Sequence, residues 1–321
     1  MQKIGMLVAA LLLTSTAPAH ASDNAVVQPI AVTPADQQAV LDYWTPSRIA
    51  ELPSAPSTPP PGQAPVDGPD GSGGGVVGTV GRLFFTERGE DASCTGTLVD
   101  GGSVITAGHC LHTFDLIRED PQWSTNLLFV PGFRDGESPY GSYTVHSAIV
   151  DAHWIANDEL DEYDQAFLLL NPATDGRTAV DAVGASHHIA FDAPGAQEVR
   201  EFGYPRSARQ PGHQGRPEFT GQRLAQCWGP ALERTGTTEW PVPRGLWGVA
   251  CDMGGGSSGG PRITNFDTTT GLGTVVGVNT QGYSVDTNGQ ECPLGDPTCT
   301  RHLGGPQLTR AITEPLYDHT R

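Results

Sequence analysis

Hydrophobic residues occur along most of this chain in short runs that polar and turn-forming residues interrupt. From residue 76 onward the runs are rich in β-branched and aromatic residues, and clusters of Gly, Pro, Asp and Asn separate them. They cover residues 76–85, 94–99, 103–106, 127–130, 142–150, 165–170, 199–204, 248–251 and 273–280. Short strands with few helical patterns between them favour an all-β sandwich or barrel. We predict helices only at residues 40–52 and 307–316.

The composition agrees with a compact β protein. The 321 residues include 41 glycines and 27 prolines, which indicates many turns and argues against a helical bundle. The formal net charge is −18, so the surface repels phosphate backbones and we expect no nucleic-acid partner. The same charge favours a soluble monomer.

The first residues have the pattern of a secretory signal peptide. Lys3 supplies the positive charge, residues 4–13 are mostly apolar, and Ala19-His20-Ala21 matches a cleavage site. The apolar stretch is too short to span a bilayer, and we expect no membrane anchor later in the chain. The sequence therefore predicts a signal peptide at residues 1–21 and a secreted, extracellular protein.

Residues 22–75 do not have the pattern of a domain. Seven prolines lie between Pro53 and Pro69, and a Gly/Ser run follows at residues 71–75. Such a composition is typical of a linker. We interpret residues 22–75 as a pro-segment and a Pro/Gly-rich linker, most of which maturation removes, and a permanent disordered tail is the alternative.

The strongest chemical signal is the sequence Gly-Ser-Ser-Gly-Gly-Pro at residues 256–261. Glycines permit backbone angles that other residues avoid, so a tight turn can aim two N–H groups at one point. The N–H groups of Gly256 and Ser258 are candidates to hold a developing oxyanion. A serine hydroxyl also needs a base nearby, because it is a poor nucleophile alone.

Two further motifs supply a candidate base and a candidate acid. His109 stands in Thr-Ala-Gly-His-Cys, directly after the predicted strand at residues 103–106. Asp164 stands before the apolar run Ala-Phe-Leu-Leu-Leu, where a carboxylate is costly to bury unless it is paired. A histidine N–H would pair it. We interpret the neighbouring acids, which include Asp161, as a solvated loop.

These motifs, in the order His, Asp, Ser, resemble the chymotrypsin/trypsin-like serine peptidases. The resemblance covers about residues 76–321 and implies two antiparallel six-stranded β-barrels, at about residues 76–185 and 186–305, with a short C-terminal helix. It implies His109 as general base, Asp164 as its orienter, Ser258 as nucleophile, and an oxyanion hole formed by Gly256 and Ser258. The segment at residues 43–49 also resembles the pro-regions of secreted bacterial members, including glutamyl endopeptidases.

The chain departs from the family at the position directly before the nucleophile. Animal members carry an acid immediately before the nucleophile, and it captures a new N-terminal amine when the zymogen is cleaved. Ser257 stands there in this chain. We therefore do not expect activation by insertion of the amine.

The sequence has an even number of cysteines, six, which suits disulfides in an exported protein. We expect Cys94 to form a disulfide with Cys110, 16 residues away, and so to tether the turn that carries His109. For the others we prefer the pairs Cys227–Cys251 and Cys292–Cys299. A rival arrangement joins Cys251 to Cys292.

The sequence allows several predictions of the residue that the specificity pocket prefers before the scissile bond. In trypsin-like relatives an acid at the position of Asp252 selects Arg and Lys, and Asn279 and Thr280 lie in the segment that resembles the substrate-pairing strand. The bridged cysteine that such relatives have four residues before the nucleophile is Gly254 here. Basic, small or apolar, and glutamyl preferences remain possible.

We expect a secreted serine endopeptidase that acts on proteins or peptides through a Ser258 acyl-enzyme, with no cofactor and no metal site. The alternative is a catalytically inactive homologue that serves as a binding module. An esterase with an α/β-hydrolase fold would need the serine before the histidine in the chain.

Overall fold

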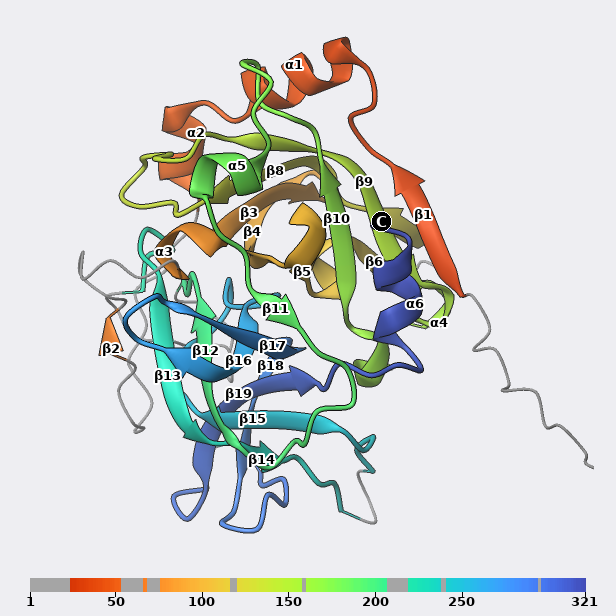
Figure 1. Cartoon of the computed structure of the whole chain (residues 1–321). Coiled ribbons are helices and arrows are strands. Elements are labelled where there is room, and N and C mark those ends of the chain that lie inside the picture. The colour runs from red at the N-terminus through yellow and green to blue at the C-terminus, as the bar shows by residue number, and fades with distance from the viewer. Residues whose placement is uncertain are drawn as a thin grey trace, which may run out of the picture.

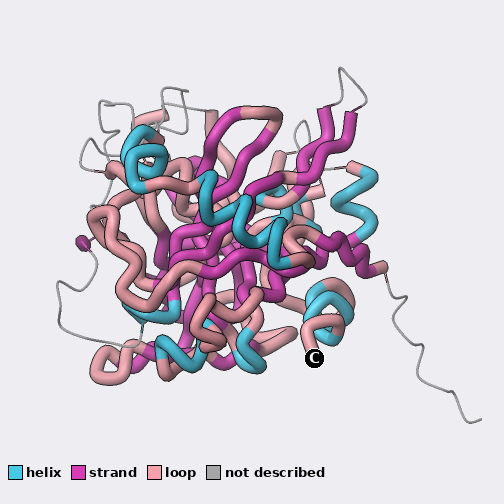
Figure 2. The backbone as a smooth tube through the Cα atoms, turned by 90° about the horizontal axis from the view of Figure 1, so that it is seen from above, coloured by secondary structure: helices cyan, strands magenta, loops and turns pink. Residues whose placement is uncertain are grey.

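The computed structural model describes residues 24–52, 66–67, 76–115, 120–157, 160–206, 219–237, 241–293 and 296–321. The predicted signal peptide and most of the Pro/Gly-rich linker lie outside these residues. The described chain forms two β-rich halves, one above the other in Figure 1. Strands run through the middle of the molecule, and most helices lie at its periphery (Figure 2). No helix in the described ranges is both long and apolar enough to cross a membrane.

The first half is a closed barrel of antiparallel strands. Its strands are β3 (Val80–Glu87), β4 (Glu90–Leu98), β5 (Val104–Thr106), β8 (Thr125–Pro131), β9 (Tyr143–Asp151) and β10 (Ala166–Leu170). Pairing between β8 and β9 closes the ring, so its six strands leave no free edge among themselves. Leu83, Phe129 and Leu168 are fully buried in one of its hydrophobic clusters.

The second half has two sheets that pack together. One contains β11 (His188–Ile189), β17 (Leu272–Val278), β16 (Pro261–Asp267), β12 (Glu198–Gly203), β13 (Ala225–Pro230) and β2 (Val66–Asp67). The other contains β14 (Leu232–Glu233), β15 (Leu246–Ala250), β19 (Thr300–Pro306) and β18 (Gln281–Val285). Strand β13 contacts β15, and a single bridge joins Gly277 to Gln307. The predicted all-β fold class is confirmed, although the ladders of the predicted second barrel are divided between these sheets.

The remaining elements are short and connect or cap the strands. They are α3 (Val76–Thr79), η1 (Asp100–Gly102), η2 (Gly108–Cys110), β6 (His112–Asp115), β7 (Asp120–Trp123), α4 (Ala152–Ala156), η3 (Asp161–Tyr163), α5 (Ala179–Val183) and α6 (Thr313–Asp318).

The N-terminal segment at residues 24–52 packs on the first barrel. Strand β1 (Ala25–Pro29) pairs antiparallel with β9, and helices α1 (Pro34–Tyr43) and α2 (Pro46–Glu51) follow it (Figure 1). The ring of Trp44 is 4% exposed and belongs to the same hydrophobic cluster as Phe84. This part of the predicted pro-segment is therefore folded onto the barrel.

Three predicted elements have different bounds in the structure. The single helix predicted at residues 40–52 is wrong, because Thr45 caps a new helix and Pro46 cannot continue the first. The strand predicted at residues 76–85 begins only at Val80, after α3. The last helix is α6, and Gln307 instead extends the β-structure through its bridge to Gly277.

The end of the chain returns to the first barrel. Helix α6 contacts β9 and β10, and the hydroxyl of Tyr317 donates to the carbonyl of Asp100 at 2.7 Å. Thr313 donates to the side-chain oxygen of Gln165, the residue directly after Asp164, at 2.6 Å. Packing of α6 therefore supports the strand that carries the candidate acid.

Candidate active site

His109 and Asp164 meet because their strands are neighbours. His109 lies on η2 just after β5, and Asp164 lies just before β10, which pairs with β5 through Ala166 and Thr106. One oxygen of Asp164 accepts the backbone N–H of His109 at 2.8 Å, and the other lies 2.8 Å from its Nδ1. The acid fixes both the backbone and the ring of His109, which leaves Nε2 for a reaction partner.

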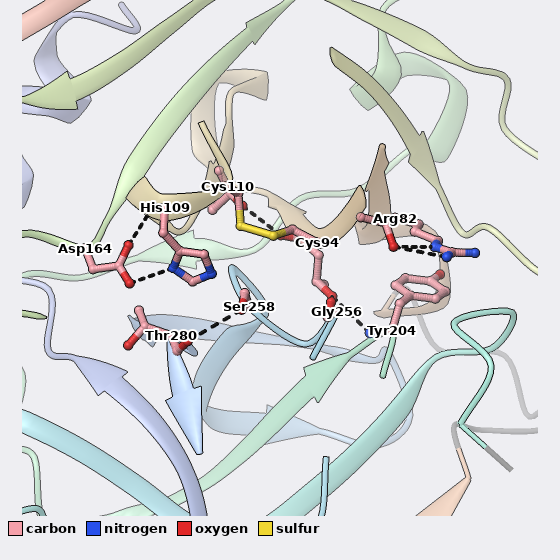
Figure 3. The surroundings of a disulfide bond; sticks show 12 residues. Arg82, Cys94, His109, Cys110, Asp164, Tyr204, Gly256, Ser258 and Thr280 are labelled. Carbon is pink, nitrogen blue, oxygen red and sulfur yellow. Dashed lines mark hydrogen bonds and ion pairs between the residues drawn. A yellow bond between two sulfur atoms is a disulfide. The ribbon is translucent and has the colours of Figure 1, made fainter. Parts of the chain in front are cut away.

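The disulfide Cys94–Cys110 anchors the turn that carries His109. Its S–S distance is 2.06 Å, and it ties η2 to β4 (Figure 3). Cys94, His109 and Cys110 bring three potential metal-ligand atoms within 4.8 Å of one another. Both sulfur atoms are in the disulfide, so neither is a thiolate ligand, and the group does not fit a metal.

The charge around His109 favours its protonated form. Burial lowers the pKa of His109, but attraction and hydrogen bonding by Asp164 outweigh burial, and the pKa is raised above its ordinary 6.5. Glu87 and Asp161 raise this pKa further. An imidazolium that forms during a reaction is therefore stabilised by the surrounding carboxylates.

The two adjacent serines have different environments. Ser257 is fully buried, whereas Ser258 is partly exposed and faces the His109 ring in Figure 3. The hydroxyl of Ser258 donates to the carbonyl of Thr280 at 3.5 Å, a long hydrogen bond. Only Ser258 is therefore accessible to a substrate.

The turn before Ser258 has a special backbone conformation at Gly256, and Thr95 holds it in place. Gly256 has φ +93°, a conformation that L side chains rarely adopt, and a Cβ there would lie 2.5 Å from the carbonyl oxygen of Tyr204. Thr95 holds this turn, because its hydroxyl donates to the carbonyl of Gly256 and its N–H donates to the carbonyl of Ser258, both at 2.8 Å. Within the described part of the chain, no acceptor takes the N–H of Gly256 or of Ser258.

Asp161 is a site residue that the sequence interpretation missed. The predicted solvated loop is wrong for this acid, because its carboxylate accepts from Gln281 at 2.7 Å and lies 3.3 Å from Arg234. Both partners belong to the second half, while Asp161 precedes Asp164 by one short turn. The acid therefore connects the loop that carries Asp164 to β18. The sequence offered no signal for this role, because Asp161 is one of four closely spaced acids, with Asp158, Glu159 and Glu162, and their spacing does not set it apart from the others.

The three residues predicted for the specificity pocket, Asp252, Asn279 and Thr280, differ in their hydrogen-bond partners. Asn279 is fully buried, and its side chain donates to the carbonyl of Phe202 at 3.2 Å, which indicates a structural position. Thr280 accepts the hydrogen bond of Ser258, and its own hydroxyl donates to the carbonyl of Gly304 at 3.4 Å. Asp252 is 2% exposed.

The other two disulfides lie in the second half. Cys227 joins Cys251, which places a covalent link seven residues before Ser258, between β13 and the end of β15. Cys292 joins Cys299 across a loop of sequence separation 7. These are the pairings preferred from the sequence, and the described residues contain no Cys251–Cys292 bond.

Known proteins resemble this chain over most of its length. The closely matching solved structures include the thermostable serine protease AL20 from an extremophilic microorganism, with 27% identity, TM-score 0.60, and coverage of 77% of this chain and 98% of that one. Protease Anisep from Arthrobacter nicotinovorans has 27% identity and TM-score 0.57, and the match covers 81% of this chain and 97% of that one. A Glu endopeptidase shares the fold at 18% identity and TM-score 0.54, over 79% of this chain and 95% of that one.

A shorter match involves a curated protein. An extracellular metalloprotease of Bacillus subtilis (strain 168) is 31% identical over 78 residues, which are 24% of this chain and 23% of that protein. The chain thus spans less than a quarter of that relative. The family model for trypsin matches residues 78–294, a range that includes His109, Asp164 and Ser258. By this match and by its fold, the chain belongs to the trypsin family of serine peptidases.

Proposed function

We propose that this protein is a secreted serine endopeptidase that forms an acyl-enzyme on Ser258. The observation that carries the proposal is the arrangement of His109 between Asp164 and Ser258, beside two N–H groups that have no acceptor in the described chain. This arrangement supports nucleophilic catalysis, because it joins a base, its orienting acid, a nucleophile and an oxyanion site.

The reaction begins when Ser258 turns its hydroxyl from the carbonyl of Thr280 toward Nε2 of His109. Such a rotation is fast for a partly exposed side chain. Oγ then attacks the carbonyl carbon of the scissile bond, and Nε2 takes the hydroxyl proton. The N–H groups of Gly256 and Ser258 stabilise the oxyanion of the tetrahedral intermediate.

The intermediate collapses when His109 gives its proton to the leaving nitrogen. The C–N bond breaks, the amine departs, and the acyl group remains on Ser258 as an ester. A water molecule then attacks this ester while His109 again accepts a proton. Breakdown of the second intermediate releases the carboxylic acid and restores the hydroxyl of Ser258.

Strand β18 supports an extended peptide as the substrate. It is the edge strand of its sheet, and β19 occupies only one of its sides at Gln281. Its later residues are covered, because Val285 bridges to Glu291 and Cys292 donates to the carbonyl of Ser284. The open part adjoins Thr280, so a peptide added there as a β-strand would pass the nucleophile.

In this proposal the precursor is cleaved by a protease within residues 22–75. A Pro-rich stretch is a favourable place for a proteolytic cut.

An irreversible phosphonylating probe directed at serine tests the proposal. We expect one label per molecule, located at Ser258 by peptide mapping, and hydrolysis of an unstructured protein substrate. Ser258→Ala and His109→Ala variants should lose both. The matched Ser257→Ala variant should keep both. A folded protein that takes no label and cleaves nothing would instead be an inactive binding module.

A further inference from the structure

The residues of the proposed reaction come from both halves of the molecule. His109 and Asp164 lie on the first barrel, whereas Ser258 and Thr280, whose carbonyl accepts its hydrogen bond, lie in the second half (Figure 3). Attack requires the base and the nucleophile to be aligned, and a misplacement of about 1 Å can cost about a hundredfold in rate. A contact that fixes the acid loop (residues 160–165) against the second half therefore bears directly on catalysis.

Asp161 makes such a contact from within the acid loop. Its backbone carbonyl accepts the N–H of Asp164 at 3.2 Å. Its carboxylate oxygen Oδ2 accepts the side-chain amide of Gln281 at 2.7 Å and Nη1 of Arg234 at 3.3 Å. Gln281 directly follows Thr280 and begins β18, the proposed peptide-binding edge. Asp161 therefore joins the backbone of the candidate acid to the strand beside the nucleophile.

The guanidinium of Arg234 is fixed by other contacts within its own half. Its Nε and Nη2 donate to Oε2 of Glu291 at 3.2 and 3.0 Å, and its Cζ lies 5.1 Å from the ring centroid of Tyr283. The side chain of Arg234 is 11% exposed, so salt screens its charge less than that of a surface arginine. Because these contacts already restrict the side chain, little rotamer entropy remains to be lost when Nη1 pairs with Asp161.

A second ion pair between the two halves provides a comparison. Arg223 of the second half lies 3.0 Å from Asp135, which follows β8 in the first. Their side chains are 60% and 48% exposed, and exposed pairs contribute little. Asp135 is also outside the acid loop. The less exposed bridge at Asp161 is therefore the better placed of the two to set the position of Asp164.

We propose that Arg234 and Gln281 are positioning residues that act through the carboxylate of Asp161. They hold the acid loop against the second half, and so keep His109 aligned with the nucleophile. The alternative is a bridge that only stabilises the fold, whose loss would lower the free energy of unfolding and leave kcat of the folded enzyme unchanged. This inference rests on the proposed peptidase function and adds residues to that same site.

Steady-state kinetics of Arg234→Met with a small peptide substrate test the inference. The variant removes the charge and the donors but keeps an unbranched side chain. We expect kcat to fall about tenfold or more and KM to stay within about twofold, because the acid loop shifts while the backbone edge of β18 remains. Arg234→Lys keeps a positive charge and should recover part of the loss. Arg223→Met, the matched control, should keep the kcat of the parent.

A double-mutant cycle shows whether Arg234 acts through Asp161. Asp161→Ala should lower kcat by a similar factor, and Arg234→Met should then have little additional effect. All kcat values are taken on the plateau above the pH midpoint, so that a change in the pKa of His109 does not contribute. If Arg234→Met fails to fold, Gln281→Leu tests the same bridge, because it removes the 2.7 Å hydrogen bond.

Hydrogen exchange separates this inference from the proposed function, because it needs no catalysis. In a Ser258→Ala background, Arg234→Met should speed amide exchange in residues 160–165 about tenfold or more, whereas Arg223→Met should not. A protein that cleaves no peptide but shows this change refutes the proposed function alone.

Three results would overturn the inference. An unchanged kcat in folded Arg234→Met, or unchanged exchange in the acid loop, would leave the bridge without a positioning role. A fall in kcat that adds fully to that of Asp161→Ala would mean that Arg234 acts by another route. A change confined to KM would make Arg234 a substrate-binding residue instead.

Discussion

Trp44 precedes the Pro-rich stretch, yet the structure makes it part of the first barrel. Its ring is 4% exposed and packs with its centroid 5.4 Å from that of Phe84 and 5.2 Å from that of Tyr43. Its indole N–H donates to the carbonyl of Asn126 at 2.5 Å. We therefore expect Trp44→Ala to destabilise the whole barrel.

The magnitude follows from the contacts that are lost. Truncation of a buried Trp to Ala typically costs about 3–5 kcal/mol, since it removes apolar contacts and leaves a cavity. Loss of the hydrogen bond to Asn126 adds about 1 kcal/mol. The two losses together amount to about 5 kcal/mol, which corresponds to a fall in Tm of roughly 10–20 °C for a protein of this size.

The assay is urea unfolding of the chain from residue 22 onward, followed by fluorescence and circular dichroism. Ser258→Ala is present throughout to prevent self-cleavage. Trp228→Ala is the matched control, because that ring is 46% exposed and its removal should cost less than about 1 kcal/mol. The two variants remove the same side chain from a buried and an exposed position.

If Trp44→Ala changes the free energy of unfolding by less than about 1 kcal/mol, the reasoning is refuted, because the N-terminal segment would then not stabilise the barrel.

The same packing predicts that the N-terminal segment stays bound to the barrel after processing. If a cut is engineered within residues 53–65, the N-terminal piece should co-purify with the barrel, held by β1 and by the ion pair of Arg48 with Asp91 at 2.6 Å. Release of that piece under native conditions would contradict the packing.

The other predictions concern catalysis and pH. Ser258→Ala should lower kcat by several orders of magnitude and Ser257→Ala should have little effect, as measured by steady-state kinetics; the opposite result would move the nucleophile by one residue. Activity should rise as His109 loses its proton, with the midpoint above pH 6.5 because its pKa is raised, and a flat kcat/KM profile from about pH 5 to about pH 9 would exclude it as the base. Asp161→Asn should move this midpoint to lower pH, since one carboxylate that raises the pKa of His109 is lost, and an unmoved midpoint would refute that electrostatic role. Burial lowers the pKa of His187 from 6.5 to about 4, so the free energy of unfolding should be largest above pH 6.5 and fall by up to about 3 kcal/mol toward pH 4. Denaturation of His187→Gln across that range should show a weaker pH dependence, and an identical slope would contradict it.

The sequence by itself determined the fold class and the candidate chemistry. Short β-rich runs between turn residues indicated barrels, because strand periodicity and turn chemistry are local properties. The candidates His109, Asp164 and Ser258 were also visible, since each stands in a short motif whose residue types have a distinct chemical reason. Local caps were partly visible as well, although Thr45 and Pro46 divided a helix that the apolar pattern had joined.

Tertiary structure alone decided which distant residues meet. Trp44 looked like part of a removable segment, and only the position of Phe84 and Asn126 gives its ring a buried place. Asp161 looked like one of several solvated acids, and its partners Arg234 and Gln281 belong to the other half of the molecule. The interactions of a charge depend on which strands lie beside it, and that information is non-local in the sequence. For the same reason, Asp252 could be aligned with a pocket position from its spacing to Ser258, but its burial became evident only in the folded chain.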